Sequence, residues 1–81
     1  YKVTLIDDEE KALDFLKSII EGIPGFEVNC AATSPFEGLN FAIGAKSDLV
    51  ITDILMPEVN GFWIAQRLKA NNIPVIITSA Q

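Results

Sequence analysis

Two short apolar runs of the chain each end in acidic residues. The run at residues 3–6 leads into Asp7 and Asp8, and the run at residues 49–52 leads into Asp53. If both runs are neighbouring parallel strands, their carboxyl ends lie side by side and three carboxylates meet at one edge of the sheet. Such carboxylates repel one another unless a cation neutralises them. The pattern therefore predicts a site for a hard divalent metal ion.

Apolar strand-like runs alternate with helical patterns, which is typical of an α/β fold with a parallel sheet. Strands are predicted at residues 2–6, 26–32, 48–52 and 74–78, because these runs are apolar or alternate with polar residues. The run at 48–52 is apolar on both faces, so we expect it to be central, whereas 26–32 alternates and is expected at an edge. Asp53 then follows a central strand, where ligands bind in open α/β sheets.

Helices are predicted between these strands. The first has apolar residues at spacings of three and four (Leu13, Leu16, Ile20 and Ile23) and is expected to end near Gly22. The second opens at residues 34–37, where Ser, Pro and Glu form a capping pattern. The third is expected over residues 61–70, after a loop that contains Pro57 and Gly61. Gly61 is expected to supply backbone freedom where the chain turns into this helix.

Composition limits the classes of function. The chain has 81 residues, 49% of them hydrophobic, and its net charge of −5 disfavours nucleic acid and anionic membranes as direct partners. One Cys and no His exclude an internal disulfide, a Cys/His zinc site and a His-activated nucleophile. No apolar run approaches the roughly 20 residues that span a bilayer. We therefore expect a single cytoplasmic domain.

Three sequence pieces stand at the ends of predicted strands. They are residues 5–9 (LIDDE), residues 53–57 (DILMP) with Gly61, and residues 74–80 (PVIITSA). Each piece is short, but together their order and positions resemble the receiver domain of two-component response regulators. The resemblance extends over residues 1–81. It implies a flavodoxin-like (CheY-like), doubly wound parallel sheet with strand order 2-1-3-4.

The resemblance also implies a role for each site residue. Asp53 would accept a phosphoryl group from a sensor histidine kinase or a phosphotransfer protein. Asp8 and Asp53 would ligate Mg²⁺ together with the backbone carbonyl of Leu55, and Asp7 would hold the ion through water. Ser79 would be the switch hydroxyl that reports phosphorylation. The domain is expected to be a signalling switch that catalyses its own phosphorylation rather than an enzyme with turnover.

The sequence departs from the family's full pattern at its end. A complete receiver has a fifth strand, which carries a phosphate-contacting Lys, and two further helices, and residues 1–81 contain neither. We therefore expect a receiver domain that is incomplete at its C-terminus. Its fourth strand, at residues 75–78, would be an exposed apolar edge and is expected to favour self-association.

Other interpretations stay open at this point. A pseudo-receiver would bind partners without phosphorylation. A metal-dependent aspartyl phosphohydrolase usually has a second Asp two residues after its nucleophile, where this chain has Leu55. Residues 7–9, taken alone, would simply favour the start of the following helix. Trp63 lies off the apolar stripe of its helix, so it either lies flat on neighbouring side chains, which we prefer, or contacts a partner.

Overall fold

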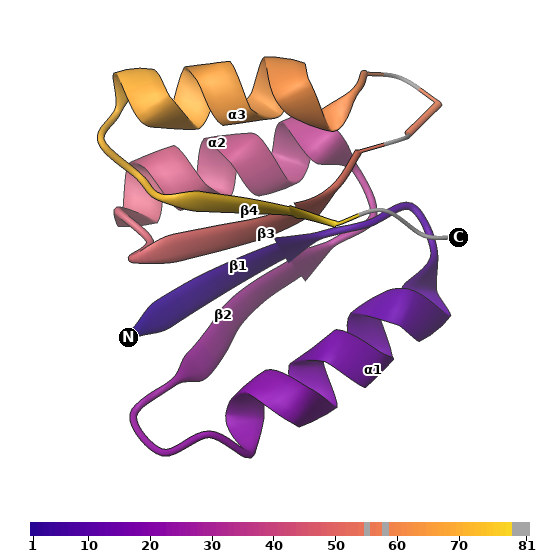
Figure 1. The fold of residues 1–81 in the computed structure, drawn as a ribbon, viewed down its shortest axis with the longest axis vertical. Coiled ribbons are helices and arrows are strands. Elements are labelled where there is room, and N and C mark those ends of the chain that lie inside the picture. Colours follow the sequence, from indigo (N-terminus) through magenta and orange to yellow (C-terminus); the bar gives the residue numbers. More distant parts are fainter. Residues whose placement is uncertain (55, 58, 79–81) are drawn as a thin grey trace.

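Residues 1–54, 56–57 and 59–78 are described by a computed structural model (Figure 1). Strands and helices alternate along this part of the chain, as the sequence predicts. Their order is β1 (Lys2–Ile6), α1 (Glu10–Glu21), β2 (Glu27–Ala32), α2 (Pro35–Ala45), β3 (Leu49–Asp53), α3 (Gly61–Ala70) and β4 (Val75–Thr78).

The four strands of the described residues form one parallel sheet in the order β2-β1-β3-β4. This confirms the predicted strand order and places β1 and β3 side by side in the middle. Ile6 pairs with Thr52, so the residues that follow these two strands leave the sheet at the same edge. The ribbon shows α1 on one face of the sheet and α2 and α3 together on the other face (Figure 1).

Each face of the sheet has its own core. The core under α2 and α3 is formed by buried apolar side chains of β1, β3 and both helices, with Ile64 and Leu68 as the fully buried residues of α3. The core under α1 is smaller and joins Leu13 to β1 and β3. Apolar strand residues thus fill both faces, which is why the central strands lack polar alternation.

The helices begin and end largely where the sequence predicts. The Ser34 side chain accepts a hydrogen bond from the Glu37 N–H at 3.4 Å, and Pro35 is the first residue of α2. Ile23 differs from the prediction, because it is exposed and lies beyond the end of α1. β3 extends one residue further than expected and includes Asp53.

The two edges of the sheet differ. Along β2, the pairing with β1 shifts by one residue, since Val3 pairs with Val28 and Thr4 with Cys30. Asn29 is the extra residue of this bulge, and its side chain accepts a hydrogen bond from the Thr4 hydroxyl at 3.3 Å. β4 pairs with β3 without a shift. β2 is therefore the irregular edge and β4 the regular one.

A buried polar contact ties β1 to the turn before β3. The Thr4 and Ser47 hydroxyl oxygens lie 2.7 Å apart, and both residues are buried. The Thr4 hydroxyl is thus shared between Ser47 and Asn29, and every buried side-chain polar atom of the described residues has a partner. Within the described ranges, none of the helices is both long and apolar enough to cross a membrane.

Candidate functional site

Three carboxylates meet at the edge where β1 and β3 end. Asp7 and Asp8 follow β1, and Asp53 is the last residue of β3. One carboxylate oxygen from each of the three lies within 4.8 Å of the others. Asp7 and Asp53 are buried, at 6% and 7% exposure, whereas Asp8 is exposed. The parallel pairing of the two central strands therefore brings together all three acids that the sequence singles out.

Asp7 is held in place by its own backbone neighbourhood. Its Oδ1 atom accepts a hydrogen bond from the Glu9 N–H at 3.0 Å, and its N–H donates to the Ala32 carbonyl at 3.2 Å. Burial raises the pKa of the Asp7 carboxyl above its usual range, and the nearby charges of Asp53, Asp8 and Glu9 raise it further; the Glu9 hydrogen bond opposes them. The site thus disfavours a negative charge on Asp7 in the absence of a cation.

The backbone around Asp53 is fixed by hydrogen bonds from two strands. The Ile54 N–H donates to the Thr78 carbonyl at 3.0 Å, and the Thr78 hydroxyl donates to the Thr52 carbonyl at 3.4 Å. The Thr52 hydroxyl in turn donates to the Asp53 carbonyl at 3.2 Å. These contacts hold the main chain at the end of β3, so that the Asp53 side chain leaves the sheet in a defined direction. Sequence patterns do not indicate the bonds that these two threonines make.

The start of α3 packs directly on the Asp53 backbone. The Gly61 N–H donates to the Ile54 carbonyl at 2.8 Å, and a Cβ at position 61 would come within 2.6 Å of the Asp53 carbonyl oxygen. Asn60 caps the helix by accepting the Trp63 N–H at 3.1 Å. Gly61 has no positive φ. The prediction that it supplies a turn conformation is therefore wrong, and close packing explains the glycine instead.

Two of the predicted site residues lie outside the described residues. They are Leu55, whose backbone carbonyl is the expected third metal ligand, and Ser79, the expected switch hydroxyl. Their roles stay predictions. Thr78, the neighbour of Ser79, pairs with Asp53 in the register of β3 and β4.

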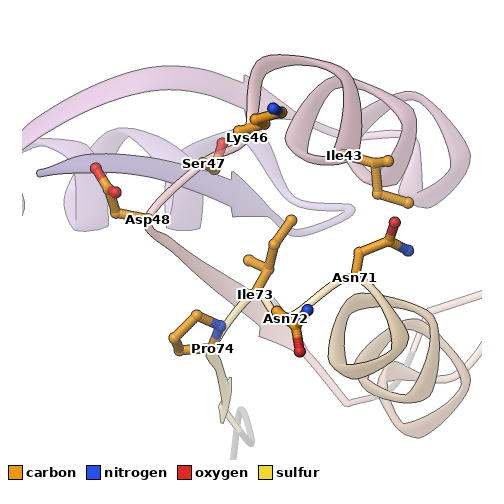
Figure 2. A pocket seen from close by; sticks show the side chains of 8 residues that line it. All are labelled: Ile43, Lys46, Ser47, Asp48, Asn71, Asn72, Ile73 and Pro74. Carbon is orange, nitrogen blue, oxygen red and sulfur yellow. The ribbon is translucent and has the colours of Figure 1, made fainter.

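A cavity of about 450 Å³ lies at the opposite edge of the sheet (Figure 2). It is formed where α2 and α3 end and where β3 and β4 begin, and Lys46 and Asp48 are its charged residues. Asp48 already accepts a hydrogen bond from the Lys2 N–H at 2.7 Å. This cavity is separated from the acidic cluster by the length of the strands, so it contributes nothing to the chemistry there.

Known proteins resemble this chain in both sequence and structure. The family model described as "Response regulator receiver domain" matches residues 3–81. The transcriptional regulator RpaA of Synechocystis is 32% identical over an alignment that covers 94% of this chain. The transcriptional regulatory protein CusR of Escherichia coli K12 is 33% identical over 98% of this chain. The chain spans about a third of the length of these relatives (33% and 35%).

Solved structures give the same result. The response regulator domain of Thermotoga maritima CheB is 30% identical and superposes with a TM-score of 0.86, over 96% of this chain and 59% of that one. The match therefore includes the fold as well as the sequence. The chain belongs to the family of response regulator receiver domains, the signalling domains of two-component systems.

Proposed function

We propose that Asp53 accepts a phosphoryl group and that this chain thereby acts as a signalling switch. The observation that carries the proposal is the meeting of Asp7, Asp8 and Asp53 at the carboxyl edge of the two central strands. A buried carboxylate at the end of a fixed strand is a positioned nucleophile. Membership of the receiver family supports the same role.

The same three carboxylates fit Mg²⁺. Carboxylate oxygens are the ligands that this hard ion prefers, and the ion is held by few protein groups. The raised pKa of Asp7 supports this assignment, since a cation would relieve the repulsion that raises it. When bound, Mg²⁺ offsets the charge that builds on the transferring phosphoryl oxygens. In this proposal Asp8 and Asp53 ligate the ion, Asp7 holds it through water, and Leu55 supplies its carbonyl.

The donor in this proposal is a phosphohistidine of a sensor histidine kinase or a phosphotransfer protein. A carboxylate oxygen of Asp53 attacks phosphorus, and a new oxygen–phosphorus bond forms. The bond between phosphorus and the imidazole nitrogen breaks, and its electron pair stays on that nitrogen. The product is an acyl phosphate on Asp53, and Ser79 is proposed to report it to an output.

Intact-mass measurement with a small acyl phosphate donor and Mg²⁺ tests this function. One added phosphoryl group is expected on the unaltered protein and none on Asp53→Asn. Asp14→Asn is a matched control, because it removes an exposed carboxylate of α1 outside the cluster and should leave labelling unchanged. Labelling that survives Asp53→Asn would refute the assignment.

Two other outcomes of that experiment correspond to the alternative functions. No labelling of the unaltered protein at any Mg²⁺ concentration would indicate a pseudo-receiver that binds partners only. Steady release of phosphate from unrelated esters would favour an aspartyl phosphohydrolase, although Leu55 occupies the position where such an enzyme usually has its second Asp.

We also propose that the chain self-associates through β4. β4 pairs with β3 on one side, and no strand of the described residues pairs with its other side. Its sequence from Val75 to Thr78 has no charge, and Ile76 is 50% exposed. A regular apolar edge of this kind is suited to pairing with another strand.

Sedimentation of the chain over a range of concentrations tests the self-association. A rising average mass is expected, and Ile76→Lys should abolish the rise because a charge at an edge strand opposes pairing. Ile23→Lys is the matched control, since Ile23 is also exposed but lies beyond the end of α1. A monomer at every concentration would contradict the proposal.

A further inference from the structure

Three side chains form a surface where α2 and α3 lie side by side, and the phosphoacceptor proposal does not use them. Phe36 is in the first turn of α2 and Trp63 in the first turn of α3. Their ring centres are 5.9 Å apart in an edge-to-face arrangement, and the Arg67 guanidinium lies 5.3 Å from the centre of the Trp63 ring. We call these residues the aromatic–arginine surface.

This surface is accessible and already organised. Phe36 is 44% exposed and Trp63 is 38% exposed, although both are large apolar side chains. The edge-to-face contact and the guanidinium above the ring hold the indole in one orientation. Trp63 thus contacts neighbouring side chains, but edge-to-face with Phe36 and not flat, and its exposed part leaves the alternative of a partner contact open. Trp and Arg are also among the residue types that contribute most of the binding energy at protein interfaces.

The charge around the surface indicates what it would bind. α3 has no acidic residue, although the whole chain has a net charge of −5, and Arg67 is the cation beside Trp63. Lys69 lies on another side of α3, where it lines a hollow with Phe62 and Val75. Glu37, the acid of α2, lines a cavity together with Asp14 of α1. The part of α3 beside Trp63 therefore carries one cation and no acid on a molecule that is acidic overall, and it is complementary to a carboxylate that lies next to an apolar group.

We infer that the aromatic–arginine surface docks an acidic protein segment that carries an apolar anchor. The anchor would pack on the rings of Phe36 and Trp63, and an adjacent carboxylate would pair with the Arg67 guanidinium. Both helices begin at the edge of the sheet where the acidic cluster lies, but none of the three side chains of the surface belongs to that cluster. The inference uses no carboxylate of the cluster, so it stands whether or not Asp53 is phosphorylated.

The probe for this inference is a short synthetic peptide of leucine and glutamate, labelled for fluorescence anisotropy. Its control is the same peptide with lysine in place of glutamate. Because the chain is acidic overall, saturable binding of the glutamate peptide requires a local basic surface. Trp63 is the single tryptophan of the chain, so its emission should shift as the glutamate peptide binds. Binding should weaken as salt is raised, since part of it is electrostatic.

Variants locate the binding. Arg67→Gln and Phe36→Ala are each expected to weaken binding of the glutamate peptide by at least about tenfold. Lys17→Gln removes one cation from the exposed side of α1 and should leave affinity unchanged. Circular dichroism would verify that each variant is folded, and phosphoryl uptake should persist in Arg67→Gln.

Three results would overturn the inference. The first is no saturable binding of the glutamate peptide, and the second is equal binding of the glutamate and lysine peptides. The third is an equal loss of affinity in Lys17→Gln and Arg67→Gln, because binding would then follow net charge and not this surface.

Discussion

Asp7→Asn is expected to stabilise the metal-free protein. The substitution keeps an oxygen that can accept the Glu9 N–H but removes a buried negative charge from the cluster. For two charges 4.8 Å apart, Coulomb repulsion amounts to about 1 kcal/mol in bulk water and to about 3 kcal/mol at the effective dielectric of a protein surface. The free energy of unfolding should therefore rise by about 1–3 kcal/mol.

Thermal unfolding in EDTA measures this gain. For a domain of this size, 1 kcal/mol corresponds to a rise in Tm of about 4–8 °C. Asp14→Asn changes the net charge equally at an exposed position of α1 and is expected to change Tm much less. A Tm for Asp7→Asn that is equal to or lower than that of Asp14→Asn would refute the idea that the cluster is self-repelling.

Added Mg²⁺ should reduce the difference in stability between Asp7→Asn and the unaltered protein. A ligand that binds the folded state at 100 times its Kd stabilises it by about 2.7 kcal/mol. The unaltered protein and Asp14→Asn should show this rise, whereas Asp7→Asn should show a smaller one if Asp7 holds the ion as proposed. Equal stabilisation of all three proteins by Mg²⁺ would place the ion elsewhere.

The same residue gives a pH dependence with a definite sign. Since the pKa of Asp7 is raised from 3.8 in the folded protein, the folded state keeps a proton that the unfolded chain has already lost. Stability of the metal-free protein therefore falls as pH rises from about 3.8 through the raised pKa, and the loss is complete above it. Urea unfolding over this pH range should show that the free energy of unfolding of Asp7→Asn exceeds that of the unaltered protein by an amount that grows with pH. A difference that stays constant with pH would contradict ionisation of Asp7 as its cause.

Further substitutions test the packing that supports the site. Gly61→Ala should destabilise the fold by about 1–3 kcal/mol, because its Cβ would overlap the Asp53 carbonyl oxygen. Gly44→Ala is its control, since nothing lies within 4 Å of a Cβ there, and it should gain up to about 1 kcal/mol in urea unfolding. Thr4→Val should lower the free energy of unfolding by about 1–3 kcal/mol because it leaves the Ser47 hydroxyl unpaired. The double variant Thr4→Val, Ser47→Ala should recover part of this loss. If the losses of the two single variants simply add in the double variant, the hydrogen bond between Thr4 and Ser47 does not contribute to stability.

The central place of β3 and the acidic edge could be predicted from local patterns in the sequence, whereas the full strand order is implied by the resemblance to receiver domains. A run that is apolar on both faces indicates a central parallel strand, and an acid placed directly after it must lie at the carboxyl edge. Asp7 and Asp53 are 46 positions apart in the sequence, yet the parallel pairing of their strands suffices to bring them together.

Features that depend on specific contacts between distant segments could not be predicted. The pattern around Trp63 indicates only that it lies off the buried stripe, and its partner Phe36 is known only once α2 and α3 are packed together. Likewise, Gly61 is required by the approach of α3 to β3, and the extra residue at Asn29 depends on the pairing of β1 with β2. No periodicity within one segment contains this information.

The bulge at Asn29 limits how far an assembly through sheet edges can grow. A filament needs two compatible edges on each copy, so that every added chain offers a new one. In this sheet the β2 edge is interrupted, while the β4 edge is regular. Pairing of two β4 strands uses the same surface on both copies and leaves only bulged edges outside. Assembly by this route would therefore close as a two-fold symmetric dimer of finite size.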